Sequence, residues 1–390
     1  MHFKTRRGII NRMDDLLKVL NEEQIKPVTD TEGAVLVLAG AGSGKTRVLT
    51  TRIAYILQQR LAQPWQILAI TFTNKAAGEM RERVQKNVAD SSSMWICTIH
   101  SMCVRILRAN IQAAGIKPDF SIYSETERKN VIKKCLKELD IDDDKAVKTA
   151  QYHIGNAKML GLDADQYVKK HAFENHIDEY MRVYEAYEKR LKENNALDFD
   201  DLLLYTLRLL RSNKEVREYY ADRFKYILVD EFQDTNYVQY SIIKLLVKEG
   251  GNLFCVGDDD QSIYGWRGAE IDNILRFDSD YPKARIYKLE RNYRSTENIL
   301  NLANEIIKNN GKRKGKKLWT DHKSGDKPTY FCAEDELGEA LYAARIISQM
   351  VNSCGYRYSD FAVLMRVNAL TRSFEQEFNN ITYLIRYSAA

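Results

Sequence analysis

The chain has 390 residues, 44% of them hydrophobic and 29% charged, which is ordinary for a globular protein large enough to hold two or three domains. Its formal net charge of +5 permits a nucleic-acid partner but is too small to indicate one by itself. No apolar run approaches the roughly 18 residues that a membrane span needs, and the basic N-terminal stretch lacks the apolar segment of a secretory signal, so we expect a cytoplasmic protein with no membrane partner.

The first predicted elements lie in the N-terminal quarter of the chain. Residues 33–39 and 67–72 are apolar runs of strand length, and residues 46–59 and 76–88 have the length and pattern of helices. The short connections between them predict a parallel sheet with crossover helices.

A glycine-rich loop follows the first predicted strand, in the stretch VLVLAGAGSGKTRVLT (35–50). A strand, a glycine loop and a helix that opens with Lys and Thr form a cradle for phosphate, because loop N–H groups and the helix N-terminus face the anion. Lys45 would reach the outer phosphates and Thr46 would hold Mg²⁺. The strict pattern has Gly where this chain has Ala39, and the alternative is a turn that merely ends a strand. The expected nucleotide-binding residues are Ala39, Gly40, Ala41, Gly42, Ser43, Gly44, Lys45, Thr46 and Arg47.

The region 116–196 has a different character, because strand signals fade and long helices of mixed charge take over, such as 175–194. Charges of both signs balance there, which indicates solvated helix faces. Apolar runs typical of buried strands return at 226–229 and 253–256, each followed by acidic residues. We therefore expect one α/β core that a helical insertion interrupts and that resumes near residue 197.

Toward the C-terminus, apolar runs of strand length appear at 284–289, 327–333 and 361–366 and alternate with helical segments such as 295–309. This alternation predicts the start of a second α/β domain. A basic run at 312–317 is expected to be a solvated loop, and the alternative is a contact with DNA.

The acidic end of the strand in YILVDEFQDTN (226–236) would complete the nucleotide site. Asp230 would hold Mg²⁺, directly or through water, together with Thr46. Glu231 follows immediately, and a carboxylate beside the metal ligand can accept a proton from the attacking water. The alternative is a strand that ends in two solvated acids.

A second acidic strand end lies in FCVGDDDQSIYGWRGA (254–269). Gln261 could hydrogen-bond the terminal phosphate or orient the water. Tyr264, Trp266 and Arg267 form an aromatic and basic cluster in a glycine-flanked loop, and such a cluster suits base stacking with phosphate contact on single-stranded nucleic acid. The alternative for Trp266 is a buried position in an inter-domain core.

Six cysteines are spread along the chain without a C-x-x-C pair. This pattern indicates reduced, packed thiols and argues against a zinc site. Nothing else in the sequence suggests a metal other than Mg²⁺.

Taken together, these segments resemble the UvrD/PcrA/Rep family of superfamily 1 DNA helicases. AGAGSGKT (39–46) is the family's form of the phosphate loop, which accounts for Ala39. LNEEQ (20–24) resembles the adenine-recognition motif and implies that Gln24 binds the adenine edge. LERNYRS (289–295) implies that Tyr293 lies against the adenine and that Arg294 reaches the γ-phosphate.

Other segments resemble the family's DNA-contact motifs. ITFTNKAAGEM (70–80) implies contacts from Phe72 and Asn74. TIHS (98–101) resembles T-F-H-S, implying a contact from His100, with Ile99 in place of the aromatic residue. VLMRVNALTRSFEQ (363–376) points to Arg366 and Asn368.

The resemblance implies a division into domains. Residues 1–15 would be an N-terminal extension, 16–115 and 197–283 the first RecA-like ATPase core, 116–196 the helical insertion, and 284–390 a partial second RecA-like core. In this family ATP binds between the two cores and a single strand crosses both, with 3′-to-5′ polarity.

The expected function is therefore that of an ATP-dependent DNA helicase, acting on single-stranded and tailed duplex DNA in repair or replication. One alternative is the helicase subunit of a recombination nuclease, and another is a nucleotide-regulated DNA-binding module that does not move. The residues alone leave RNA open as the substrate. The family's late motifs are not found before residue 390, so we expect this chain to bind nucleotide but not to unwind duplex DNA by itself.

Overall fold

The computed structural model describes residues 16–88, 91–141, 145–174, 176–265 and 268–380. The chain divides into two compact units, residues 1–325 and 326–390, which are described separately. In the described ranges, no helix combines the length and the apolar character needed to cross a bilayer.

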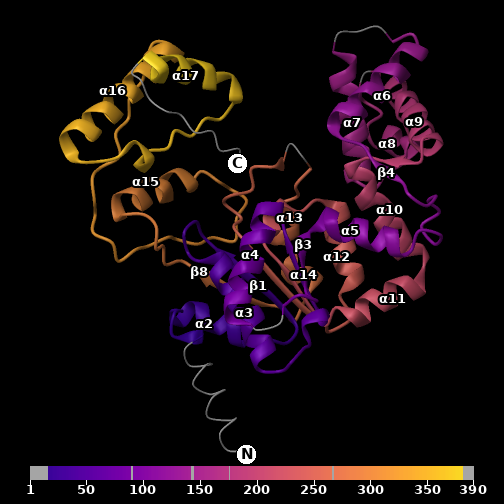
Figure 1. The fold of residues 1–390 in the computed structure, drawn as a ribbon, viewed down its shortest axis with the longest axis horizontal. Coiled ribbons are helices and arrows are strands. Elements are labelled where there is room, and N and C mark those ends of the chain that lie inside the picture. The colour runs from indigo at the N-terminus through magenta and orange to yellow at the C-terminus, as the bar shows by residue number, and fades with distance from the viewer. Residues whose placement is uncertain (1–15, 89–90, 142–144, 175, 266–267, 381–390) are drawn as a thin grey trace, which may run out of the picture. The chain divides into compact units, whose positions relative to one another are not determined.

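The larger unit is built on a six-stranded sheet with the strand order β3-β2-β6-β7-β1-β8 (Figure 1). All of its neighbouring strands pair in parallel. The strands are β1 (Ala34–Ala39), β2 (Ile67–Thr71), β3 (Trp95–Thr98), β6 (Tyr226–Val229), β7 (Asn252–Gly257) and β8 (Arg285–Leu289). A parallel sheet with crossover helices is the architecture that the sequence predicted.

Helices cover both faces of this sheet. Alternate side chains of β1 enter two hydrophobic clusters, Leu36 and Leu38 on one face and Val35 and Val37 on the other. Because both faces are covered, each central strand is a continuous apolar run rather than an alternating one. The first face is covered by α5 (Ile99–Ala109), α10 (Phe199–Ser212) and α12 (Tyr237–Leu246), and the second by α3 (Lys45–Gln58) and α4 (Asn74–Asn87). The remaining helices around the sheet are α2 (Glu22–Thr29), α11 (Lys214–Arg223), α13 (Asp272–Leu275), α14 (Phe277–Asp280) and α15 (Glu297–Ile307).

The helices of the insertion pack against one another (Figure 1). They share a hydrophobic cluster of their own. Two short strands, β4 (Ser121–Ile122) and β5 (Ala196–Leu197), pair in parallel where it leaves and rejoins the core. Lys158 fastens it to α10, because its fully buried ammonium lies 3.0 Å from Asp198 Oδ2 and 2.6 Å from Asp201 Oδ1. The insertion helices are α6 (Glu125–Glu138), α7 (Ala146–Met159), α8 (Ala164–Lys170) and α9 (Ile177–Glu193).

The smaller unit contains α16 (Glu336–Cys354) and α17 (Thr371–Asn380), which contact each other. The prediction of strands at 327–333 and 361–366 is wrong, because both segments are irregular. A strand needs the backbone of a second strand to satisfy its N–H and C=O groups, and the described part of this unit offers none.

The C-terminal prediction also differs from the structure at residues 284–289. β8 is a strand as expected, but it pairs with β1 at the edge of the first sheet. A boundary at residue 284 therefore does not coincide with the end of this sheet. The division into two RecA-like cores and an insertion stays a prediction.

Candidate active site

The glycine loop joins the end of β1 to the start of α3. Gly42 and Gly44 have φ values of +68° and +92°, which side chains rarely tolerate. A Cβ at Gly42 would also lie only 2.7 Å from the Asn292 side chain. No side chain caps α3, so the N–H groups of its first turn, which includes Lys45, Thr46 and Arg47, are available to a phosphate.

Residues of two other segments lie against this loop. Gln24 is buried, and its Nε2 donates to the carbonyl oxygen of Ser43 at 2.8 Å. Asn292 Nδ2 donates to the carbonyl oxygen of Ala41 at 2.6 Å, and the Tyr293 N–H donates to that of Gly42 at 3.0 Å. The structure thus brings together the loop and the residues that the resemblance assigned to adenine.

Arg294 follows Tyr293 in the same turn. Its backbone N–H donates to Asn292 Oδ1 at 2.8 Å, and its Cβ lies 2.9 Å from the position that a Cβ on Gly42 would occupy. The guanidinium of Arg294 is therefore carried by a backbone that packs directly against the phosphate loop.

Two carboxylates at the end of β6 face the loop. Lys45 Nζ lies 3.1 Å from Glu231 Oε2, which also accepts a hydrogen bond from Gln233 Nε2 at 2.9 Å. Glu231 has a φ of +49°, a left-handed conformation that costs a non-glycine residue about 1 kcal/mol or more. Burial, together with the neighbouring charge of Glu231, raises the pKa of Asp230 to about 6.

These residues fit a magnesium ion. Asp230 is a buried carboxylate whose ionised form is disfavoured by its surroundings, so a nearby cation would lower its free energy. Carboxylate and hydroxyl oxygens, as in Asp230 and Thr46, are the ligands that Mg²⁺ prefers. Both residues would hold the ion, and the ion would neutralise charge on the phosphates of a nucleotide.

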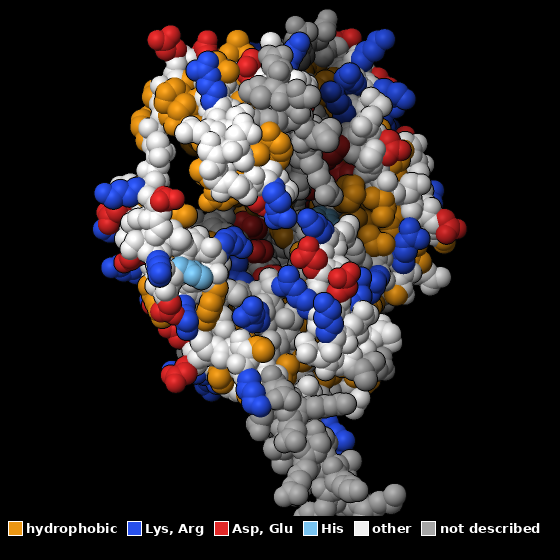
Figure 2. All heavy atoms as spheres, turned by 60° about the vertical axis from the view of Figure 1, so that its left-hand side comes forward, with side chains coloured by type: hydrophobic (Ala, Val, Ile, Leu, Met, Phe, Trp, Pro, Cys, Tyr) orange, Lys and Arg blue, Asp and Glu red, His pale blue; other side chains and the backbone are white. Residues whose placement is uncertain are grey.

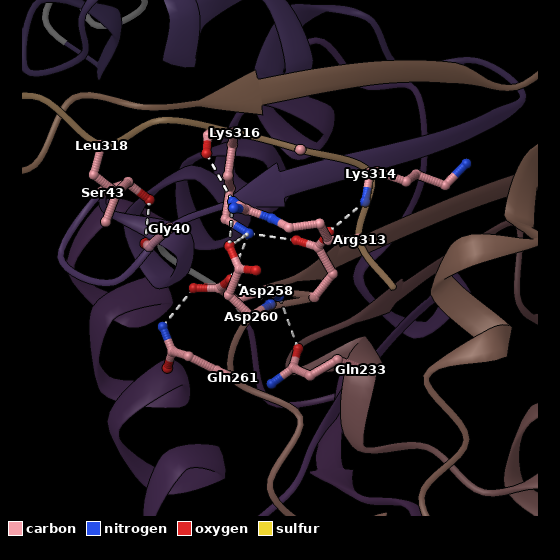
Figure 3. A network of polar contacts seen from close by, with 12 residues as sticks. Gly40, Ser43, Gln233, Asp258, Asp260, Gln261, Arg313, Lys314, Lys316 and Leu318 are labelled. Carbon is pink, nitrogen blue, oxygen red and sulfur yellow. Dashed lines mark hydrogen bonds and ion pairs between the residues drawn. The ribbon is translucent and has the colours of Figure 1, made fainter. Parts of the chain in front are cut away.

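The second acidic strand end lies beside the loop as well (Figure 3). Gln261 Nε2 donates to Asp258 Oδ2, and the Asp258 N–H donates to Gln233 Oε1 at 2.9 Å. Hydrogen bonds therefore connect Gln261 to Glu231 through Asp258 and Gln233. Gln233 was not predicted as a site residue, although it lies in the stretch 226–236, two residues after Glu231.

The expectation that the basic run 312–317 is a solvated loop is wrong for its central residues. The side chain of Lys316 is only 2% exposed and pairs with Asp258, Asp259 and Asp260. The positive charge of Lys316 is neutralised by these aspartates, which are more than fifty residues away in the sequence. Lys312 and Lys317 are exposed.

Three of the residues expected to contact DNA line a cavity of about 790 Å³ in the larger unit, namely Phe72, His100 and Tyr264. The rings of Phe72 and Tyr264 stack with centroids 5.2 Å apart and an interplanar angle of 25°. His100 lies edge-on to Phe199 with centroids 6.0 Å apart, and burial lowers its pKa. Asp230 and Glu231 line the same cavity, so the aromatic residues and the carboxylates open onto one space.

The other expected DNA contacts are placed differently. Asn74 is the first residue of α4 and is exposed. Trp266 and Arg267 lie outside the described residues. Arg366 and Asn368 are exposed residues of the smaller unit. Figure 2 shows Lys and Arg side chains interspersed with Asp and Glu over the face it presents, so the case for nucleic acid there depends on particular side chains rather than on one basic patch.

The chain matches the UvrD/REP helicase N-terminal domain over residues 20–282 and the UvrD-like helicase C-terminal domain over residues 287–388. The ATP-dependent DNA helicase PcrA of Staphylococcus aureus (strain Mu50) is 49% identical over 376 residues, which are 95% of this chain and 51% of that relative. The ATP-dependent DNA helicase PcrA of Staphylococcus epidermidis (strain ATCC 12228) is 48% identical over the same shares. The chain therefore spans about half the length of these curated relatives.

Proposed function

The chain belongs to the UvrD/REP helicase family, and from this premise we propose that it binds and hydrolyses ATP with Mg²⁺ and couples hydrolysis to movement on single-stranded DNA, in the 3′-to-5′ direction. The DNA substrates are single strands and tailed duplexes, and the process served is repair or replication. A cytoplasmic location stays a prediction. Protein partners are not part of the proposal.

The observation that carries the proposal is the pair of Lys45 and Glu231 at the mouth of an uncapped helix. In the absence of nucleotide, Lys45 neutralises Glu231. A triphosphate in the loop would compete for the ammonium, because its charge is larger and lies among N–H donors. Glu231 Oε2, released from the ammonium of Lys45, would then accept a proton from water, so nucleotide binding itself would activate the base.

Hydrolysis would then transfer the γ-phosphoryl group of ATP to water. The water oxygen attacks the γ-phosphorus, its proton passes to Glu231, and the bond to the β–γ bridging oxygen breaks to leave ADP and phosphate. Lys45 and Arg294 would neutralise the charge that develops on the phosphoryl oxygens. Gln261 would orient the water or the terminal phosphate.

The aromatic wall supports a single-stranded substrate. Phe72 is 39% exposed although it stacks on Tyr264, and exposed aromatic faces stack bases at about 1–3 kcal/mol per base. Because Asp230 and Glu231 line the same cavity as Phe72 and Tyr264, a strand bound there would lie near the hydrolytic residues and would alter their geometry. Asn74, Trp266, Arg267, Arg366 and Asn368 remain proposed DNA contacts.

The test is the rate of ATP hydrolysis by the purified chain with single-stranded DNA, with RNA of equal length, and with neither. We expect stimulation by DNA and none by RNA. Equal stimulation by both would overturn DNA as the substrate class, and tight binding of nucleotide and DNA without hydrolysis would favour the non-moving binding module.

The finer expectation, that this chain does not unwind duplex DNA by itself, stays a prediction. A strand-displacement assay on a 3′-tailed duplex tests it directly. Displacement that requires ATP would contradict it.

A further inference from the structure

A short segment after α15 contacts both the acidic turn that follows β7 and the phosphate loop. We call residues 313–319 the basic strap and residues 258–261 the aspartate turn. Figure 3 shows the side chains of Arg313 and Lys316 of the strap directed at the aspartate turn, and Leu318 beside Gly40. The side chain of Lys314 points away from the turn and pairs with Asp278 at 2.9 Å. Both ends of the strap thus lie at parts of the candidate active site.

At the first end, Lys316 is enclosed by three carboxylates. Its Nζ lies 2.6 Å from Asp258 Oδ1 and 2.8 Å from Asp260 Oδ2, and it also pairs with Asp259. Carboxylate oxygens of the three aspartates lie within 4.8 Å of one another, as they would around a metal ion. The ammonium of Lys316 therefore occupies the place of a cation.

Other strap residues complete the neutralisation. Arg313 Nη2 donates to Asp260 Oδ2 and to the carbonyl oxygen of Lys316, both at 2.8 Å. The backbone N–H of Lys314 donates to Asp259 Oδ2 at 2.7 Å. Burial opposes the charge of Lys316, but the aspartates outweigh it and raise its pKa, so the lysine stays charged at neutral pH.

The second end of the strap is fixed against the phosphate loop. A Cβ at Gly40 would collide with Leu318 Cδ2, so the Leu318 side chain packs directly against the backbone of the loop. Asn304 brackets Leu318, donating from Nδ2 to its carbonyl oxygen at 2.9 Å and accepting its N–H at 3.2 Å. The carbonyl oxygen of Trp319 accepts the N–H of Asn292 at 2.7 Å, two residues before Arg294.

Hydrogen bonds lead from Lys316 to the reacting groups. Asp258, which Lys316 holds, accepts from Gln261 Nε2. Its own N–H donates to Gln233 Oε1 at 2.9 Å, and Gln233 Nε2 donates to Glu231 Oε2 at the same distance. The carboxylate of Asp258 thus orients Gln261, and its backbone N–H orients Gln233.

We propose that Lys316 is a positioning residue for ATP hydrolysis, whose buried ammonium serves as a tethered cation in the aspartate turn and, through Asp258, fixes Gln261 and Gln233 beside Glu231. The proposal rests on the proposed ATP hydrolysis. It assigns Lys316 no contact with the nucleotide, so its loss should slow turnover rather than weaken ATP binding.

The test compares Lys316→Ala with Lys317→Ala, which removes the same charge from the next, exposed residue. We expect kcat for ATP to fall about 10- to 100-fold in Lys316→Ala, as for a misplaced catalytic group, with KM within about threefold of wild type. Methylammonium should restore part of kcat in Lys316→Ala alone, whereas tetramethylammonium, which cannot donate hydrogen bonds, should not. Unchanged kcat, or an equal loss in Lys317→Ala, would overturn the proposal.

If Lys316→Ala does not fold, the same change is made together with Asp259→Asn and Asp260→Asn, which reduces the uncompensated charge. The triple variant should fold and remain slow, because Asp258 still lacks its cation. The variant with both Asn changes and an intact Lys316 should turn over faster than the triple variant. Equal rates in these two variants would overturn the proposal.

A readout without ATP separates this proposal from the proposed function. Amide exchange in residues 256–264 should be faster in Lys316→Ala than in wild type and unchanged in Lys317→Ala. If the wild-type chain does not hydrolyse ATP, the proposed function fails and no turnover remains for Lys316 to assist. If wild type hydrolyses ATP but exchange is unaltered in Lys316→Ala, only the tethered-cation proposal fails.

Discussion

Two neighbouring strands of the sheet end in acidic clusters that differ in how their charge is neutralised. At the end of β6, burial raises the pKa of Asp230 and of Asp234 to about 6, with the charge of Glu231 as a further cause. At the end of β7, Asp259 is also buried, but hydrogen bonds and charge from Lys316 lower its pKa. The carboxylates at the end of β6 therefore carry more negative charge than nearby cations neutralise. The carboxylates at the end of β7 are neutralised by Lys316.

The difference shows that acidic residues at a strand end do not by themselves indicate a metal site. The β6 cluster has Lys45 as an ion-pair partner of Glu231, and that lysine lies where a triphosphate would compete for it. The β7 cluster is closed around Lys316, which leaves no place for a metal ion. What distinguishes the proposed site for Mg²⁺ and ATP is the carboxylate charge that the protein leaves without a cation.

The largest expected effect is a difference in the free energy of unfolding between variants of Lys316 and of Lys45. Lys316→Met leaves two buried carboxylates, Asp258 and Asp259, without their cation, and removing one partner of a buried ion pair costs about 3–5 kcal/mol. Lys45→Met removes a pair whose Glu231 side chain is 37% exposed, and such pairs contribute at most about 1 kcal/mol. Urea denaturation at neutral pH without nucleotide measures both. Equal losses of stability would mean that the two clusters are neutralised alike.

The next effect concerns chemistry at the β6 cluster. Glu231→Gln should still bind ATP with Mg²⁺ but hydrolyse it at least about 100-fold more slowly, because an amide cannot accept the proton from water. Single-turnover rates and nucleotide binding, measured on the same preparation, separate the two steps. Turnover at the wild-type rate would remove Glu231 from the role of general base.

Local sequence patterns were enough to predict most of the sheet and the β6 half of the site. Strands β1, β2, β6 and β7 are apolar runs bounded by turns or acids, because they are buried on both faces. The four-residue strand β3 was missed, since Trp-Ile-Cys-Thr is too short to give a periodic signal. Lys45 and Glu231 were found because a fixed spacing from glycines or from a strand end carries their chemistry.

The role of the basic strap was not predictable in the same way. The nearest aspartate partner of Lys316, Asp260, lies 56 residues before it, and a local sequence window shows only a run of positive charge. Lys316 is buried and paired because the strap packs between the aspartate turn and the phosphate loop, and this packing cannot be read from neighbouring residues in the sequence. The irregular 327–333 and 361–366 segments teach the same lesson, because an apolar run becomes a strand only where another strand lies beside it.

The smallest expected effect is a gain in stability at the β6 cluster. The pKa of Asp234 is raised to about 6 from an ordinary 3.8, so the folded state binds its proton more tightly, and stability is lost as pH rises between about 4 and 6. Asp234→Asn cannot incur this loss, which is at most about 3 kcal/mol. Because Asp234 Oδ1 is buried without a hydrogen-bond partner, an amide would leave a group equally unsatisfied, and we expect a net gain of about 1 kcal/mol.

The measurement is the midpoint of thermal unfolding without nucleotide. The midpoint of Asp234→Asn should be higher than that of wild type at pH 8, and the two midpoints should be equal near pH 4. The control Asp165→Asn, at an exposed position, should have the same midpoint as wild type at both pH values. A gain that is larger at pH 5 than at pH 8 would show that the carboxylate of Asp234 is already compensated, and the contrast between the two strand ends would then be reduced to Asp230 alone.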